Sequence, residues 1–146
     1  MKVVKTARSN RRDEIITAAA QVFLATGYGE TSIDTVAREA GVSKPTIYKY
    51  FDSKEELFLA IVDSITQKIL QPLGEVDIHS KGPLEALELF GNRFMKGMLT
   101  DSGVRLLRLM VAEGARFTEL PEAFVNCASR PVRDQLVAYF EAQNKK

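Results

Sequence analysis

Apolar side chains recur at intervals of three and four residues along almost the whole chain, and the alternating β-branched runs typical of strands are missing. This pattern predicts an all-α protein. A polar stretch over residues 75–82 is expected to connect a long fourth helix to a second helical bundle. The expected helices cover residues 10–26, 32–40, 43–50, 53–74, 83–99, 103–116, 120–128 and 131–142.

Helix start and stop signals divide the first half of the chain into short segments. Gly27 can end the first helix in the left-handed conformation, which glycine adopts without steric cost. Pro45 lies in the first turn of the third helix, where proline is tolerated. Ser53 and Glu56 have the spacing of a capping box. The expected N-terminal caps are Thr31 or Ser32 for the second helix, Ser43 for the third and Ser53 for the fourth.

Residues 32–50 meet the mechanical requirements of a helix-turn-helix. Ala37 lets two short helices approach closely, and Gly41 can take a positive φ in the turn between them. On a helical wheel, Ile47 and Phe51 face inward. The opposite face of the third helix carries Pro45 and Lys49, flanked by Thr46 and Tyr48. Small, aromatic, hydroxyl and ammonium groups together favour contact with a DNA groove over contact with water alone.

The run TSIDTVAREAGVSKPTIYKYFDSKEEL at residues 31–57 resembles the DNA-binding signature of TetR-family regulators, and the resemblance extends over about residues 10–70. It implies that Thr31, Ser32 and Tyr48 contact phosphates and that Lys54 holds another phosphate with help from the helix dipole. Base edges or nearby sugars would be contacted by Lys44, Pro45, Thr46 and Lys49. Tyr50 lies between the outward and inward faces and completes the candidate set of DNA-binding residues.

The resemblance also implies two domains with different functions. Residues 1–52 would form a three-helix DNA-binding domain with a basic N-terminal arm, and a long helix would join it to a helical domain at residues 53–146 that binds a small molecule and dimerises. Large apolar side chains in the second half fit either an adaptable pocket or an ordinary core. The candidate pocket residues are Phe94, Met98, Met110 and Phe117.

These expectations lead to a homodimeric repressor that binds a pseudo-palindromic double-stranded operator and is released by a small-molecule effector. TetR-family members commonly continue with further long helices, whereas this chain stops at Lys146. Either the last apolar stripe is buried in a shortened dimer interface, or the chain is a truncated product with exposed apolar surface. The alternative is a helical interaction or small-molecule-binding protein that keeps the fold but lacks operator-binding dimer geometry.

Composition changes this picture in a few respects. A hydrophobic content of 45% with 27% charged residues describes a soluble globular chain, and no apolar run suits a membrane span or signal peptide, so a cytoplasmic location is expected. One cysteine and one histidine, Cys127 and His79, provide no internal disulfide and no four-ligand zinc site. We expect no cofactor, no metal and no enzymatic activity. The five charged residues among the first twelve are all basic, which suits a phosphate backbone.

Overall fold

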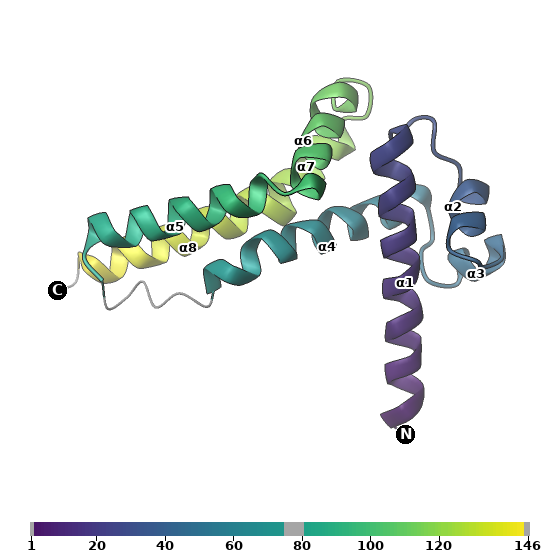
Figure 1. The fold of residues 1–146 in the computed structure, drawn as a ribbon, viewed down its shortest axis with the longest axis horizontal. Helices are drawn as coiled ribbons and strands as arrows, with labels where there is room; N and C mark the ends of the chain where they lie inside the picture. The colour runs from purple at the N-terminus through teal and green to yellow at the C-terminus, as the bar shows by residue number, and fades with distance from the viewer. Residues whose placement is uncertain (1, 75–80, 145–146) are drawn as a thin grey trace.

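The computed structural model describes residues 2–74 and 81–144, and within these ranges it contains helices and no strand. Figure 1 shows α2 and α3 on one side of α1, while α4 leads from this region toward the C-terminal helices. The helices are α1 (Lys2–Thr26), α2 (Ile33–Glu39), α3 (Lys44–Tyr48), α4 (Lys54–Gly74), α5 (Pro83–Met98), α6 (Asp101–Glu113), α7 (Glu119–Phe124), the π-helical turn η1 (Val125–Ser129) and α8 (Arg130–Gln143).

The helix order confirms the sequence pattern, and the boundaries differ most from it at three places. Helix α1 begins at Lys2 instead of residue 10, because residues 2–9 contain no glycine or proline that would stop a helix. Helix α6 ends at Glu113 instead of residue 116. The amides of Arg116 and Phe117 both donate to the Glu113 carbonyl in the turn that follows. The expected helix at 120–128 is divided between α7 and η1. His79 and the side chain of Cys127 lie outside the described residues.

Helix α4 carries an apolar face that packs against helices of both halves. Leu57, Phe58 and Ile61 near its start are fully buried, and the helix packs against α1 there and against α5 further along. Seven apolar residues at helical spacing along α4 are all buried. They belong to one continuous core that also takes side chains from α1, α2, α5 and α6. These seven are Leu57, Phe58, Ile61, Val62, Ile65, Ile69 and Leu70.

The core of the N-terminal half includes one face of α1. Ile15, Ala19 and Phe23 of α1 are fully buried, as the helical spacing predicts. Near the other end of the chain, the apolar stripe of α8 is divided. Tyr139 is buried and its hydroxyl donates a hydrogen bond to the Lys81 carbonyl at 3.1 Å. Two other large apolar residues of that stripe, Val137 and Phe140, stay exposed.

Alanine substitutions at two glycines should shift stability in opposite directions. Gly41 has a φ of +63°, and a Cβ there meets nothing within 4 Å, so Gly41→Ala should destabilise the fold by about 1–2 kcal/mol through backbone strain alone. Gly91 lies inside α5, again with nothing within 4 Å, and Gly91→Ala should stabilise by about 0.5–1 kcal/mol. Urea unfolding measures both changes, and shifts of the same sign would contradict the assigned turn.

Candidate nucleic-acid interface

The turn between α2 and α3 is built around Gly41. Its amide donates to the Arg38 carbonyl at 3.3 Å, and the next amide, of Val42, donates to the Ala37 carbonyl at 3.0 Å. With a positive φ at Gly41, this pair of bonds is the Schellman ending of a helix. Ala37 is buried, and its small side chain lets α2 and α3 pack closely. The structure therefore confirms the helix-turn-helix predicted from the sequence.

Helix α3 has one buried side and one exposed side. Ile47 and Phe51 are fully buried, whereas Pro45 and Lys49 are exposed. Tyr48 keeps 45% of its surface exposed. The arrangement leaves the outward side chains of α3 available to a groove. It matches the orientation predicted from the helical wheel.

Lys44 is tied to the preceding helix by an ion pair. Its ammonium Nζ donates to Oδ2 of Asp34 at 2.8 Å, so a salt bridge joins the start of α3 to α2 across the turn. The hydrogen bond and charge of Asp34 raise the pKa of Lys44 above its ordinary value. Both side chains are well exposed, so the pair adds little stability. Its effect is to place a carboxylate beside an outward-facing ammonium group.

Two of the expected phosphate contacts are placed differently from the sequence expectation. Thr31 is buried, and its hydroxyl donates to the Gly27 carbonyl at 2.6 Å, so its side chain holds the α1–α2 loop instead of facing solvent. Lys54 is half-buried at the start of α4, with Nζ 3.3 Å from the Gly29 carbonyl oxygen and 4.6 Å from the Tyr28 ring centroid. Desolvation lowers the pKa of Lys54, against the opposing effect of nearby glutamates.

The remaining candidates lie at or near the surface. Ser32 is exposed and caps α2 by accepting a hydrogen bond from the Thr35 amide at 3.1 Å. Thr46 is half-buried, and its hydroxyl lies 2.8 Å from that of Ser43. Ser43 occupies the expected N-cap position of α3 but makes no side-chain cap hydrogen bond. Tyr50 is half-buried and packs against the core, consistent with its position between the two faces.

Basic residues of α1 approach the same region. The Arg12 guanidinium lies 5.0 Å from the centroid of the Phe51 ring, within the range of a cation–π contact. Arg11 pairs with Glu14 at 3.0 Å on the surface of α1. Helix α1 already begins at Lys2, so the part of the chain expected as a basic arm belongs to this helix. In Figure 1 it projects beyond the other helices.

One loop next to this region was not predicted as important. Tyr28 is buried between α1 and α2, and its ring packs against Phe58 at 5.0 Å and Phe117 at 4.8 Å between centroids. Its amide and that of Gly29 both donate to the carboxylate of Glu113. The pair of glycines around Tyr28 is the only sequence feature that marks this loop, and nothing in the sequence pattern pairs it with Glu113.

A cavity of about 690 Å³ lies between the C-terminal helices. Most of its lining is apolar and comes from α4, α5 and α8, and Phe94 and Met98 belong to it as predicted. Met110 is buried in the core, and Phe117 packs against Tyr28, so neither lines this cavity. Helical spacing alone does not separate residues that face a cavity from residues that face the core, which explains the difference.

Comparison with known families identifies the two halves. The family model described as bacterial regulatory proteins, tetR family, matches residues 15–61, and a model described as AefR-like transcriptional repressor, C-terminal domain, matches residues 85–146. The chain belongs to the TetR family. The first match covers the helix-turn-helix, and the second covers the C-terminal helices that line the cavity together with α4. The family expectation drawn from residues 31–57 is thus confirmed.

Individual TetR-family proteins resemble this chain over different lengths. The HTH-type transcriptional activator FasR of Mycolicibacterium smegmatis is 37% identical over 87 residues, which are 57% of this chain and 40% of FasR. The chain spans less than half the length of this curated relative. The structure of the flavonoid-responsive regulator FrrA is also similar to this chain, with a TM-score of 0.80 and 29% identity. The match covers 94% of this chain and 69% of FrrA. Salmonella enterica GusR gives a TM-score of 0.74 and 28% identity, over 93% of this chain and 69% of GusR.

Two other kinds of feature are absent from the described residues. Within residues 2–74 and 81–144, no helix has the length and apolar character required to cross a membrane. No group of three or more histidine, cysteine, aspartate or glutamate side chains in the described part is arranged to hold a metal ion.

The two serines at the starts of α2 and α3 should differ in their effect on stability. Ser32→Ala removes a side-chain cap from α2 and should cost about 1 kcal/mol of unfolding free energy. Ser43→Ala is the matched control, because the Ser43 hydroxyl makes no cap hydrogen bond to an α3 amide, and it should cost less. Chemical denaturation of both variants measures the difference. An equal or larger loss in Ser43→Ala would show that the two caps are assigned wrongly.

Proposed function

We propose that this chain is a DNA-binding transcriptional repressor that inserts α3 into the major groove and is released by a largely apolar small molecule. The observation that carries the proposal is the orientation of α3. Burial of Ile47 and Phe51 fixes the helix, and Pro45, Tyr48 and Lys49 are left facing outward. The major groove of B-DNA is about 12 Å wide and admits such a helix.

The proposed contacts divide by chemistry. Lys49, as an exposed ammonium group, suits phosphates or the acceptor edge of guanine, and the Thr46 methyl and hydroxyl suit base edges. Lys44 and Pro45 lie at the start of α3 and would approach bases or sugars. Phosphate contacts are proposed for Ser32, Tyr48 and Lys54, with Tyr50 beside them. For Thr31 the buried hydroxyl supports a role in holding the loop that leads into α2.

A second copy of the chain is part of the proposal. Paired recognition helices that enter successive major grooves require a twofold dimer and half-sites about 34–36 Å apart. Exposed apolar side chains on α5 and α6, including Leu87, Met95 and Val111, offer surface for association. Repression, rather than activation, is supported by the C-terminal match to a repressor model, although the relative FasR bears the name of an activator.

The effector class follows from the cavity. Its wall is mainly apolar, and a few polar groups, among them Thr66 and Asn144, lie within it. A volume of about 690 Å³ falls in the range of pockets that bind drug-sized ligands. The structural neighbour FrrA is named as flavonoid-responsive, which supports a flat, weakly polar aromatic molecule as the first probe.

Selection of bound sequences from a random DNA pool tests the DNA-binding proposal. The expected product is a sequence with two inverted half-sites. Sedimentation equilibrium of the same protein should show a dimer. A stable monomer that enriches no sequence would overturn the proposal and support a helical interaction protein instead.

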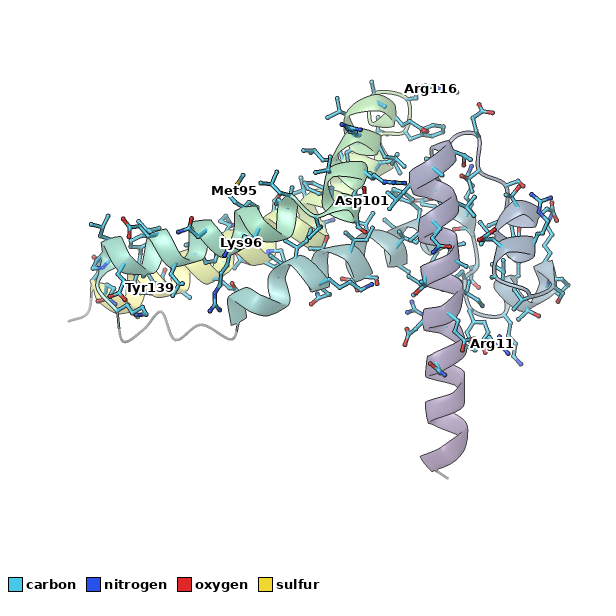
Figure 2. All side chains as sticks on the ribbon, viewed as in Figure 1. Arg11, Met95, Lys96, Asp101, Arg116 and Tyr139 are labelled. Atoms are coloured by element: carbon cyan, nitrogen blue, oxygen red, sulfur yellow. The ribbon has the colours of Figure 1, made fainter. Side chains whose placement is uncertain are left out.

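Lys49→Met should weaken binding to the selected DNA and reduce its salt dependence. Each lost phosphate contact lowers the slope of log affinity against log salt by about 0.9. Lys96→Met is the matched control, because Lys96 is exposed on α5, far from α3 in Figure 2. Fluorescence anisotropy at several salt concentrations measures both slopes. If Lys49→Met and the control show the same affinity and the same slope, Lys49 is removed from the proposed contact set.

Filling the cavity should abolish the response to an apolar effector. Leu136 lines the cavity from α8 and is half-buried, so Leu136→Trp places a larger side chain in the ligand space. The wild-type protein should be stabilised by the flavonoid naringenin, by about 2.7 kcal/mol at a hundred times its Kd, and Leu136→Trp should lose this gain. Thermal unfolding with and without the probe measures both. Equal stabilisation of the two proteins would place the ligand elsewhere.

A further inference from the structure

The carboxylate of Glu113 joins the end of α6 to the loop between α1 and α2. Oε1 accepts a hydrogen bond from the Tyr28 amide at 2.7 Å, and Oε2 accepts one from the Gly29 amide at 2.7 Å. These partners are more than eighty positions apart in the sequence. Because both oxygens bind successive amides and the acceptor is charged, the contact fixes orientation as well as distance.

The loop has the shape that this contact requires. Gly27 has a φ of +91°, and a Cβ at this position would lie 2.2 Å from Oε1 of Glu113. A Cβ at Gly29 would lie 3.4 Å from Oε2 of the same carboxylate. Glycine at 27 therefore serves two needs, a left-handed backbone and the close approach of a distant side chain.

The loop held by Glu113 leads directly to the proposed DNA-binding elements. Thr31 donates to the Gly27 carbonyl at 2.6 Å, immediately before Ser32 caps α2. Lys54, at the start of α4, has its ammonium group 3.3 Å from the Gly29 carbonyl oxygen. The contact with Glu113 thus reaches the beginning of α2 and the beginning of α4 through one short loop.

An aromatic contact supports the same junction. The Phe117 ring, four residues beyond Glu113, meets the Tyr28 ring edge to face at 4.8 Å between centroids. Arg116 lies at this end of α6, next to the C-terminal end of α1, in Figure 2. A carboxylate and an aromatic ring from the C-terminal half therefore hold the same loop of the N-terminal half.

We infer that Glu113 is a positioning residue for DNA binding, which sets the orientation of the helix-turn-helix relative to the C-terminal helices. The inference rests on the proposed function. A single helix-turn-helix needs no such link to approach one half-site. Two of them bind two half-sites together only when their orientation in the dimer is fixed, because a small rotation at the junction moves α3 out of register with its groove.

Glu113→Gln tests the inference with little change of shape. The amide keeps one acceptor oxygen, but its NH2 group faces a backbone donor, so one of the two bonds and the negative charge are lost. Glu122→Gln is the matched control, an exposed carboxylate on the neighbouring α7. The Ile61 amide in the buried part of α4 reports on the integrity of the core.

The first readout needs no DNA. Amide hydrogen exchange at Tyr28, at Gly29 or at both should be at least tenfold faster in Glu113→Gln than in the wild-type protein, and unchanged in Glu122→Gln. Exchange at Ile61 should be equal in all three proteins. Unchanged exchange at Tyr28 and Gly29 would overturn the inference, and faster exchange at Ile61 would assign Glu113 to general stability.

The second readout uses duplexes derived from the DNA that the wild-type protein selects. Glu113→Gln should bind the duplex with two half-sites about tenfold more weakly than wild type, while its affinity for a duplex with one half-site stays the same. Equal loss on both duplexes would overturn the positioning role. Failure of the wild-type protein to select any DNA would overturn the proposed function itself, and the exchange result would still show whether the Glu113 contact exists.

Discussion

The continuous apolar face of α4 is the constraint on which the other parts of the molecule depend. Its first residues, such as Phe58, are buried with α1, and its later residues, such as Ile69, belong to the same core near α5. Because one rigid helix serves both halves, the N-terminal helices cannot move freely on a linker. Motion between the halves has to be a small rotation about packed side chains, and such cores resist continuous deformation. A polar contact at the junction, such as that of Glu113, therefore affects the position and orientation of α3.

The helical pattern predicted most of this arrangement, because helix ends and buried helix faces each require particular residue types at particular positions. A left-handed residue at the end of a helix favours glycine, as at Gly27 and Gly41, and a buried helix face requires apolar residues at the spacing seen in α4. The start of α1 was predicted too late, because residues 2–9 lack the apolar spacing that marks residues 15–24, although no glycine or proline in them stops a helix. The expected basic arm is accordingly the first part of this helix.

Tertiary contacts set the limit of what the sequence could predict about the site. The outward face of α3 was predicted because it depends on one helix alone. Thr31 was expected at a phosphate, but its hydroxyl has a closer partner in the Gly27 carbonyl, which only the folded loop brings near. Phe117 was expected in a pocket, and its actual neighbour, Tyr28, is distant in sequence. Glu113 had no mark at all, since a glutamate near the end of a helix is ordinarily a solvated group.

Charge alone does not give this protein its proposed DNA specificity. The formal net charge is +1, and near α3 the Lys44 ammonium is paired with Asp34 while that of Lys54 lies against the Tyr28 ring and the Gly29 carbonyl. Charge attracts the chain to the backbone of any DNA alike, so the specificity for an operator has to come from the simultaneous fit of two recognition helices. A regulator of this kind is sensitive to the angle between its halves. Helix α6 carries both Leu107 in the cavity wall and Glu113 at the loop, so under the proposals above a ligand that shifts α6 acts on that angle directly.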